Sequence, residues 1–369
     1  MIDFNNPLFL KKNFKNFNSV VKNQIFSGNG EWTNKCQNLL KKKFNFKKVL
    51  LTDSCTSALE IAALSLDFKI GDEVIIPSYS YPTTASAFLR CGFTIRFVDN
   101  QKNLPFIDKN KLENIISKKT KAIVIVHQCG QLEDLDYFLK LKKKNIYIIE
   151  DAAQSIGLKY MNNYAGSFGD FGCYSFHETK NIHCGLGGAL IINNKKFYKK
   201  SHYIWERGTN RVDIKKDFKK KYKWVEIGSN FYSSEFQSAF LYEQIKKINY
   251  ILKRRKKLFL EYKKQFNQTD NKNIMTINFS KKSNYHMVYI LVKKKFLRQK
   301  LIKYLMKYKI HSVSHYEPLH LSPVGKRSTV SYDICNAQDF SKRIIRLPIH
   351  LSLKIKQIKY IVQKISEFF

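Results

Sequence analysis

The 369-residue chain contains three short segments whose residue types could do chemistry together. The segment TDSCTSALE sets small hydroxyl residues, among them Thr56 and Ser57, between an apolar run and a helix-like stretch. Free backbone N–H groups and the helix dipole favour an anion at such a place. The segment therefore fits a phosphate cradle without a glycine-rich loop, although alone it would also fit an ordinary capped helix.

The second segment, EDAAQS, puts Asp151 directly after the apolar run NIYII. A carboxylate at the end of a strand can pair with a protonated pyridine nitrogen, and that ion pair lets the ring of a cofactor act as an electron sink. In isolation, Asp151 would equally suit the start of a helix.

The third segment, CYSFHETKN, places Lys180 between an apolar run and the glycine-rich GLGGAL. A partly desolvated amine in such a turn can form a Schiff base with a carbonyl. A phosphate cradle, an aspartate and a lysine, in this order, are jointly much more specific than any one of them. Together they predict a pyridoxal-phosphate (PLP) enzyme whose Schiff-base lysine is Lys180.

These residues must be positioned by a parallel sheet with crossover helices, because short β-rich runs alternate with helix-like segments from residue 49 to about 194. Ligands of such sheets collect beyond the carboxyl ends of the strands. The predicted strands cover 49–52, 73–77, 94–99, 121–127, 145–151, 173–176 and 189–193.

Helices are predicted between the strands, with Thr56 capping the first, Pro82 opening the second and Asp108 capping the third. After Ser233 the pattern favours a long connecting helix, and from about Tyr285 it changes to short strands and a helix. We therefore expect a large α/β domain over residues 1–245 and a smaller C-terminal α+β domain over 246–369.

The formal net charge of +37 invites a nucleic-acid function. The basic residues are mostly lysines spread along the whole chain, so we expect no nucleic-acid partner and an attraction for anionic substrates instead. No apolar run is long enough for a membrane span, and the N-terminus lacks the features of a signal peptide, which predicts a cytoplasmic protein. The seven scattered cysteines suggest reduced thiols, neither disulfides nor metal ligands.

With these three segments the chain resembles the DegT/DnrJ/EryC1/StrS sugar aminotransferases, a branch of the fold-type I PLP-dependent transferases. Within that family it most resembles the transaminases that make dTDP-4-amino-4,6-dideoxygalactose for surface polysaccharides such as O-antigen and enterobacterial common antigen. The segments that carry the resemblance are GNGEWTNKCQ, VLLTDSCTSALEIAAL, GDEVIIPSYSY, EDAAQS, GSFGDFGCYSFHETKN, ERGTNR, YKWVEIGS and HYEPLH.

The resemblance implies a role for each matching residue. Lys180 and Asp151 would be catalytic, with Asp151 facing the pyridine nitrogen. The expected cofactor contacts are Gln154 to the ring hydroxyl, Tyr81 stacked on the ring, Thr56, Ser57 and Ser175 to the phosphate, and Asn230 to the phosphate across a homodimer interface. His315 and His320 would lie on the substrate side, and no metal is expected.

The resemblance also has two departures. Leu186 stands where the family commonly has a glutamate, so any polar role of that side chain beside the sugar is missing. Tyr232 and Ser233 replace the family's common Arg-Met, which puts the choice of Asn230 in doubt.

The implied reaction is a transfer of the amino group of L-glutamate to dTDP-4-dehydro-6-deoxy-D-glucose, giving dTDP-4-amino-4,6-dideoxy-D-galactose. Amination at C3 or of another nucleotide keto sugar stays open. A PLP-dependent sugar dehydratase would carry a histidine at the position of Lys180, which argues against that activity. A non-catalytic nucleic-acid or regulatory protein on the same fold is the alternative from another class.

Overall fold

The computed structural model describes residues 1–369 except 68, 215–216, 270–271, 279–281 and 332. Its main sheet has the strand order β1-β9-β8-β5-β4-β2-β3-β12. These strands span Lys48–Thr52 (β1), Glu73–Pro77 (β2), Thr94–Val98 (β3), Thr120–Val126 (β4), Tyr147–Asp151 (β5), Phe171–Ser175 (β8), Gly188–Ile192 (β9) and Thr329–Ser331 (β12). Only β9 runs antiparallel to its neighbours, so the predicted mostly parallel sheet is confirmed.

Apolar residues on both faces of the strands explain why helices cover the sheet on both sides. In β2, Val74 and Ile76 enter one core with the helices α3 and α4, while Ile75 enters another with α5 and α6. The side-chain period of two along a strand produces this division. The helices span Cys55–Ser65 (α3), Pro82–Leu89 (α4), Lys109–Ile115 (α5) and Leu135–Lys142 (α6).

The helix starts agree with the sequence in two of three cases. Asp108 caps α5, and Pro82 is the first residue of α4. The expected cap at Thr56 is wrong, because the side chain of Ser54 accepts a hydrogen bond from the N–H of Ser57 and so caps α3.

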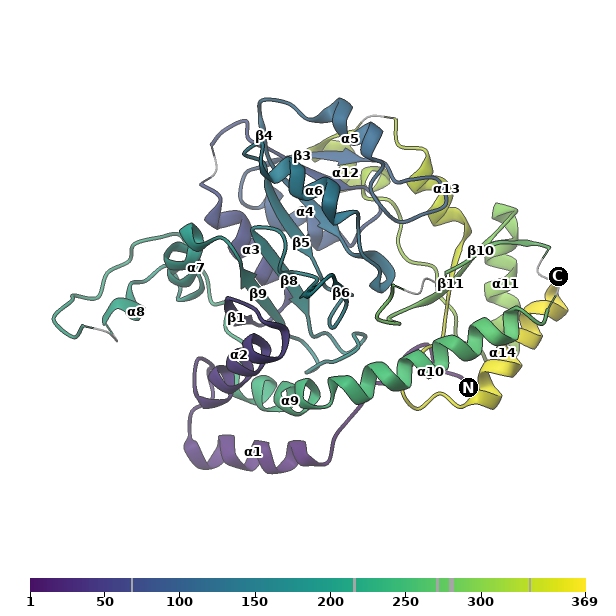
Figure 1. Cartoon of the computed structure of the whole chain (residues 1–369), viewed down its shortest axis with the longest axis horizontal. Coiled ribbons are helices and arrows are strands. Elements are labelled where there is room, and N and C mark those ends of the chain that lie inside the picture. Colours follow the sequence, from purple (N-terminus) through teal and green to yellow (C-terminus); the bar gives the residue numbers. More distant parts are fainter. Residues whose placement is uncertain (68, 215–216, 270–271, 279–281, 332) are drawn as a thin grey trace.

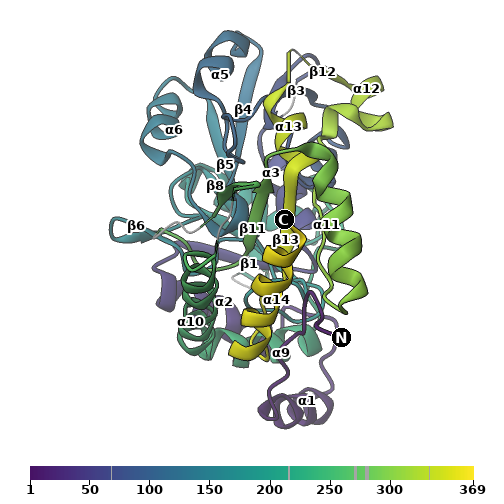
Figure 2. The ribbon, with the colours of Figure 1, turned by 90° about the vertical axis from the view of Figure 1, so that its right-hand side faces the viewer.

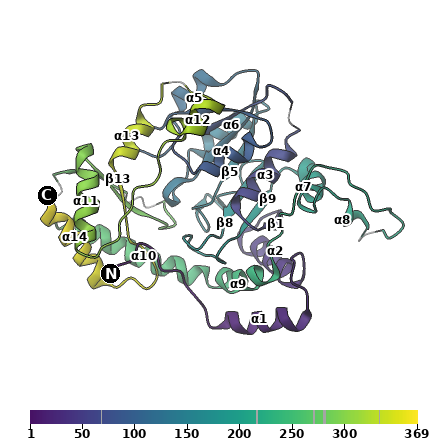
Figure 3. The same ribbon diagram turned by 180° about the vertical axis from the view of Figure 1, so that it is seen from behind.

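Further helices lie beneath and beside the sheet (Figure 1). Helix α1 lies beside α9 in Figures 1 and 3, and the segment that carries α8 projects from the body. Their bounds are Lys12–Asn23 (α1), Glu31–Phe44 (α2), Tyr198–Trp205 (α7), Arg211–Ile214 (α8) and Glu235–Lys246 (α9), with the short hairpin Lys159–Tyr160 (β6) and Asn163–Tyr164 (β7) and the single turns Gln128–Gly130, Lys195–Phe197 and Leu319–Leu321.

The C-terminal part has its own core around a three-stranded antiparallel sheet of order β10-β11-β13, packed by α10, α11 and α14 (Figure 2). The predicted long helix is interrupted at Lys247, between α9 and α10. The elements span Ile248–Phe266 (α10), Ile274–Ile277 (β10), Val288–Val292 (β11), Lys295–Lys307 (α11), Pro323–Ser328 (α12), Asn336–Arg343 (α13), Ile344–Leu347 (β13) and Ile355–Phe368 (α14). The division between residues 245 and 246 stays a prediction.

Two contacts join segments that are distant in the sequence. Strand β12 joins the edge of the main sheet, with Thr329 paired in parallel to Ile95 of β3. Near the N-terminus, Ile2 forms a parallel bridge with Ile310. The N-terminal residues and the segment of β12 are therefore both built into the fold.

Candidate active site

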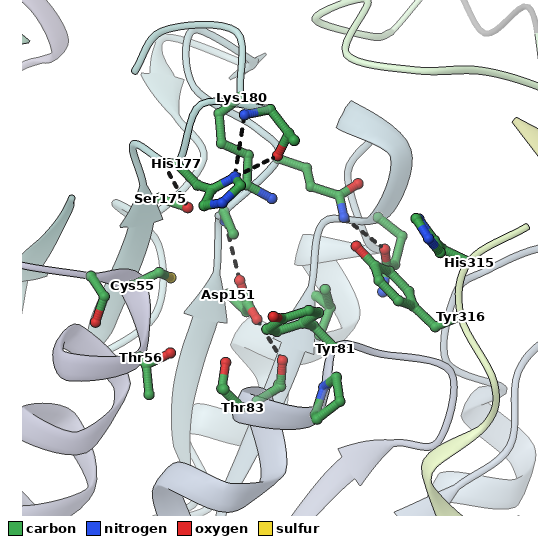
Figure 4. A pocket seen from close by; sticks show the side chains of 18 of the residues that line it. Cys55, Thr56, Tyr81, Thr83, Asp151, Ser175, His177, Lys180, His315 and Tyr316 are labelled. Carbon is green, nitrogen blue, oxygen red and sulfur yellow. Dashed lines mark hydrogen bonds between the residues drawn. The ribbon is translucent and has the colours of Figure 1, made fainter. Parts of the chain in front are cut away.

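A cavity of about 520 Å³ lies at the carboxyl ends of β5 and β8 and at the start of α3. It brings together residues from Phe4 to Arg346, which are 342 positions apart in the sequence (Figure 4). The sequence-predicted residues that line it are Thr56, Tyr81, Asp151, Gln154, Ser175, Lys180 and His315.

The pairing of β1, β9 and β8 brings together the residues at the phosphate end of the cavity. Ser175 at the end of β8 pairs with Gly188, and Gly188 pairs in turn with Thr52 at the end of β1. A side chain at Gly188 would come within 2.4 Å of the backbone of Ser54. Glycine therefore lets the start of α3 approach the hydroxyl of Ser175.

The first turn of α3 supplies the other half of this end of the cavity. Because Ser54 provides the cap, the half-buried Thr56 keeps its hydroxyl at the cavity wall. The N–H groups of a first helical turn have no partners within the helix and favour an anion. These donors and the hydroxyl of Ser175 suit a phosphate.

Asp151 ends β5 and lies at the bottom of the cavity. Its Oδ2 accepts a 2.9 Å hydrogen bond from Thr84, and its Oδ1 accepts one of 3.1 Å from the N–H of Ala153. Burial raises the pKa of Asp151, although these hydrogen bonds and the charge of Lys180 oppose that rise. A buried carboxylate held in this way is suited to a cationic partner inside the cavity.

Lys180 lies in the turn after β8, where its backbone N–H donates to the carbonyl of His177 at 2.9 Å. The side chain is half-buried and lines the cavity, as predicted from its place before the glycine-rich turn. Burial, followed by the charge of Lys180, lowers the pKa of the neighbouring His177. The lysine thus faces the cavity together with a neutral imidazole.

Gln154 and Tyr81 also line the cavity, in different environments. The Gln154 Oε1 accepts from the N–H of Cys129 at 2.8 Å, and its Nε2 donates to Gln128 at 3.3 Å, so the amide is held in place. The ring of Tyr81 is 54% exposed and packs edge-on against Tyr316 with ring centroids 5.7 Å apart.

Three predicted site residues lie outside the cavity lining. The hydroxyl of Ser57 donates to Asp53 and lies 3.0 Å from the hydroxyl of Ser54. His320 is buried, with its ring nitrogens against Ser78 (2.6 Å) and Gln338 (3.0 Å). Their contacts to cofactor or substrate remain predictions.

Asn230 is the third, and it is exposed on the described chain. Its Oδ1 accepts a 2.9 Å hydrogen bond from Arg207. A role in a neighbouring subunit's site stays a prediction.

Several lining residues were missed by the sequence reasoning. Thr84, which holds Asp151, lies one turn into α4, and His286 and Arg346 come from the C-terminal part. A signal existed for Arg346, because a charged residue in the apolar run IIRLPI is unusual. No comparable signal marks Thr84, whose contact with Asp151 spans 67 positions of the chain.

Comparison with known proteins shows the family of this chain. The model of the DegT/DnrJ/EryC1/StrS aminotransferase family matches residues 9–366. The chain belongs to this family. Among the family's characterised members, it is 28% identical to the GDP-perosamine synthase of Escherichia coli O157:H7, over 98% of this chain and 97% of that one.

Two further relatives come from Helicobacter pylori. The chain is 29% identical to the UDP-4-amino-4,6-dideoxy-N-acetyl-β-L-altrosamine transaminase of strain ATCC 700392 / 26695, over 88% of this chain and 86% of that one. The solved structure of PseC, an aminotransferase involved in the biosynthesis of pseudoaminic acid, superposes with a TM-score of 0.91 at 28% identity and covers both chains fully.

The family confirms the predicted fold, the PLP cofactor and the enzyme class, a PLP-dependent nucleotide-sugar aminotransferase. The donor set fits that cofactor, because it combines an anion site, a buried carboxylate and a primary amine in one cavity. Within the described residues, no helix is long and apolar enough to cross a membrane.

Proposed function

We propose that this enzyme transfers the amino group of L-glutamate to C4 of a nucleotide-linked 4-keto-6-deoxy sugar. The specific substrate we propose is dTDP-4-dehydro-6-deoxy-D-glucose, which would give dTDP-4-amino-4,6-dideoxy-D-galactose for a surface polysaccharide. One observation carries the proposal: the amine of Lys180, the buried carboxylate of Asp151 and the hydroxyls of Thr56 and Ser175 line a single cavity. The segments SFHETKN and GTNR support the dTDP sugar, and the 4-amino-4,6-dideoxy sugar in a relative's name supports position C4.

Bound PLP supplies an electron sink for the carbon from which a proton is removed. Thr56, Ser175 and the first turn of α3 would hold its phosphate, and Asp151 would accept a hydrogen bond from its ring nitrogen. The Nζ atom of Lys180 would take the proton from one carbon and return it to another, as general base and then general acid. The ring of Tyr81 would cover one face of the cofactor and limit the access of water.

The sugar nucleotide is tested by incubating the PLP-loaded enzyme and L-glutamate with the dTDP-, GDP- and UDP-linked 4-keto-6-deoxy sugars in parallel. Formation of 2-oxoglutarate reports turnover, and NMR of the product reports the position and configuration of the new amine. We expect the highest kcat/KM with the dTDP sugar and an axial amine at C4. A preference for the GDP or UDP sugar, or amination at C3, would contradict this specificity while keeping the enzyme class.

The working unit proposed is a homodimer in the cytoplasm in which Asn230 of one subunit completes the phosphate site of the other. The exposure of Asn230 and its fixed side chain, held by Arg207, support this arrangement. Cyclic two-fold dimers are also the commonest symmetric assembly.

A further inference from the structure

Arg346 is a buried cation at the wall of the cavity. It lies in β13, where its backbone pairs with Tyr289 of β11 on one side and Val313 on the other. Only 8% of the residue is exposed, and the side chain lines the same cavity as Lys180. The fold therefore fixes a guanidinium beside the reacting groups.

The hydrogen-bonding capacity of this guanidinium is only partly used. Its Nη1 lies 3.1 Å from the Nδ1 of His315, and the ring of Phe4 covers it at 5.1 Å from the central carbon. Its Nε is buried and has no hydrogen-bond partner in the described part of the chain. Buried polar groups rarely stay unpaired, and the cost is larger for a charged group.

Among the described residues, no acidic side chain pairs with Arg346. The titratable groups that respond to its charge are Tyr79, Cys129, His286 and His315, and none of them carries a negative charge at neutral pH. This corner of the cavity is therefore positive.

His286 lines the cavity together with Lys180 and Arg346. Burial lowers the pKa of His286 far below its usual value, and the charges of Lys180, Arg255 and Arg346 lower it further. The imidazole of His286 also lines the cavity, with its Nδ1 fixed 3.0 Å from the Oδ1 of Asn181. Lys180, His286 and Arg346 line the same cavity, so the guanidinium and the reacting amine face one enclosed space.

We infer that Arg346, backed by His315, binds a carboxylate of the amino donor while the donor's amino group reacts beside Lys180. The inference rests on the proposed function, because it assigns a position to the amino acid in the first half of that reaction. Arg346 would then discriminate α-amino acids from simple amines.

A carboxylate fits this place better than the diphosphate of the sugar nucleotide. The guanidinium is planar and can donate two parallel hydrogen bonds, which matches the two oxygens of a carboxylate. A burial of more than nine tenths favours a small anion over a bulky nucleotide.

The experiment compares Arg346→Gln with the wild-type PLP-loaded enzyme by titration calorimetry. Glutarate is the unreactive dicarboxylate probe, and dTDP is the diphosphate probe. Arg254→Gln is the control, because Arg254 donates to the carbonyls of Leu351 and Leu353 and is not among the described residues that line the cavity. A single-turnover reaction with L-glutamate, followed by the change in PLP absorbance, gives a second readout that needs no sugar.

We expect Arg346→Gln to weaken glutarate binding by about 10- to 100-fold and to slow the glutamate half-reaction, while dTDP binding and PLP content stay unchanged. Unchanged glutarate binding overturns the inference, as does a loss confined to dTDP, which would assign the cation to the diphosphate. If Arg346→Gln fails to hold PLP, the same comparison is made with Arg346→Lys, which keeps the charge and loses the planar fork. A wild-type enzyme that does not bind glutarate overturns the inference even if sugar amination succeeds with another donor.

Discussion

The hydroxyl of Thr84 donates a 2.9 Å hydrogen bond to the carboxylate of Asp151, although the two residues belong to different strand-helix units. This contact links α4 to the end of β5 and fixes one carboxylate oxygen. Thr84 therefore positions the carboxylate that we propose faces the cofactor ring.

Replacing Thr84 by valine should reduce turnover moderately. The change keeps the shape of the side chain and removes one buried hydrogen bond, worth about 1 kcal/mol, or roughly fivefold. The pH profile of kcat should shift as the carboxyl group loses a donor that favours its charged form. Thr84→Ser should restore both values, and an unchanged pH profile in the valine variant would argue against a positioning role.

Asp151→Asn should lower the activity and raise the stability of the protein. We expect a loss of turnover of about 100-fold or more, because a neutral amide cannot pair with a protonated ring nitrogen. The free energy of unfolding of the cofactor-free variant should rise at pH 7. The raised pKa of Asp151 means that its ionised form is disfavoured in the folded state, so the wild type loses stability as pH rises above about 3.9. Equal stability at pH 7 would contradict the second expectation.

Lys180→Ala should hold PLP only by noncovalent contacts. Borohydride reduction followed by mass spectrometry should find the cofactor attached to the wild type and absent from the variant. The control is Lys256→Ala, since Lys256 is exposed on α10. Covalent cofactor on the Lys180 variant would assign the attachment to another lysine.

The free energy of unfolding should fall as the pH drops from about 7 to 5, because the buried histidines outnumber Asp151 and Glu133, whose raised pKa values act in the opposite direction. Burial lowers the pKa of six histidines, so protons bind the unfolded chain first and stability decreases below about pH 6.5. The six are His177, His183, His286, His315, His320 and His350. His286→Asn keeps a donor for Asn181 and should flatten this dependence in denaturant titrations, whereas a slope equal to the wild type would exclude a contribution from His286.

Mixing Lys180→Ala with Asn230→Ala should restore some activity if neighbouring subunits share each site. One of the two sites in such a heterodimer would contain both native residues, so each heterodimer could have up to about half of the wild-type activity. Random exchange in an equimolar mixture makes about half of the dimers heterodimers, so the mixture could recover up to about a quarter. Complete subunit exchange, measured with differently tagged chains, is the control. Full exchange without activity, or a monomeric active enzyme by sedimentation, would exclude the shared site.

The sequence predicted those parts of the site that follow directly from strand ends. All seven predicted strands are found within a few residues, and β2 has the predicted bounds 73–77. Asp151 could be inferred because it ends an apolar strand, whereas Ser175 was expected from the family resemblance. Thr84 and Arg346 could not be assigned, because their positions depend on tertiary contacts between distant segments.

The sequence also could not predict which residue caps helix α3. Three neighbouring hydroxyl residues, Ser54, Thr56 and Ser57, could each have capped α3, and sequence alone does not rank them. In the structure Ser54 is the cap, the hydroxyls of Ser54 and Ser57 donate to Asp53, and Thr56 lines the cavity.

The pairing of β12 with β3 affects how the chain can fold during translation. Strand β3 is complete once residue 98 has been translated. Its outer edge can form hydrogen bonds with β12 only after Thr329–Ser331 have been translated, more than 200 residues later. At roughly 5–20 residues per second, that edge stays open for at least ten seconds during translation. An open parallel edge is a template for wrong strand pairing, so β3 is exposed to mispairing until residues 329–331 have been made.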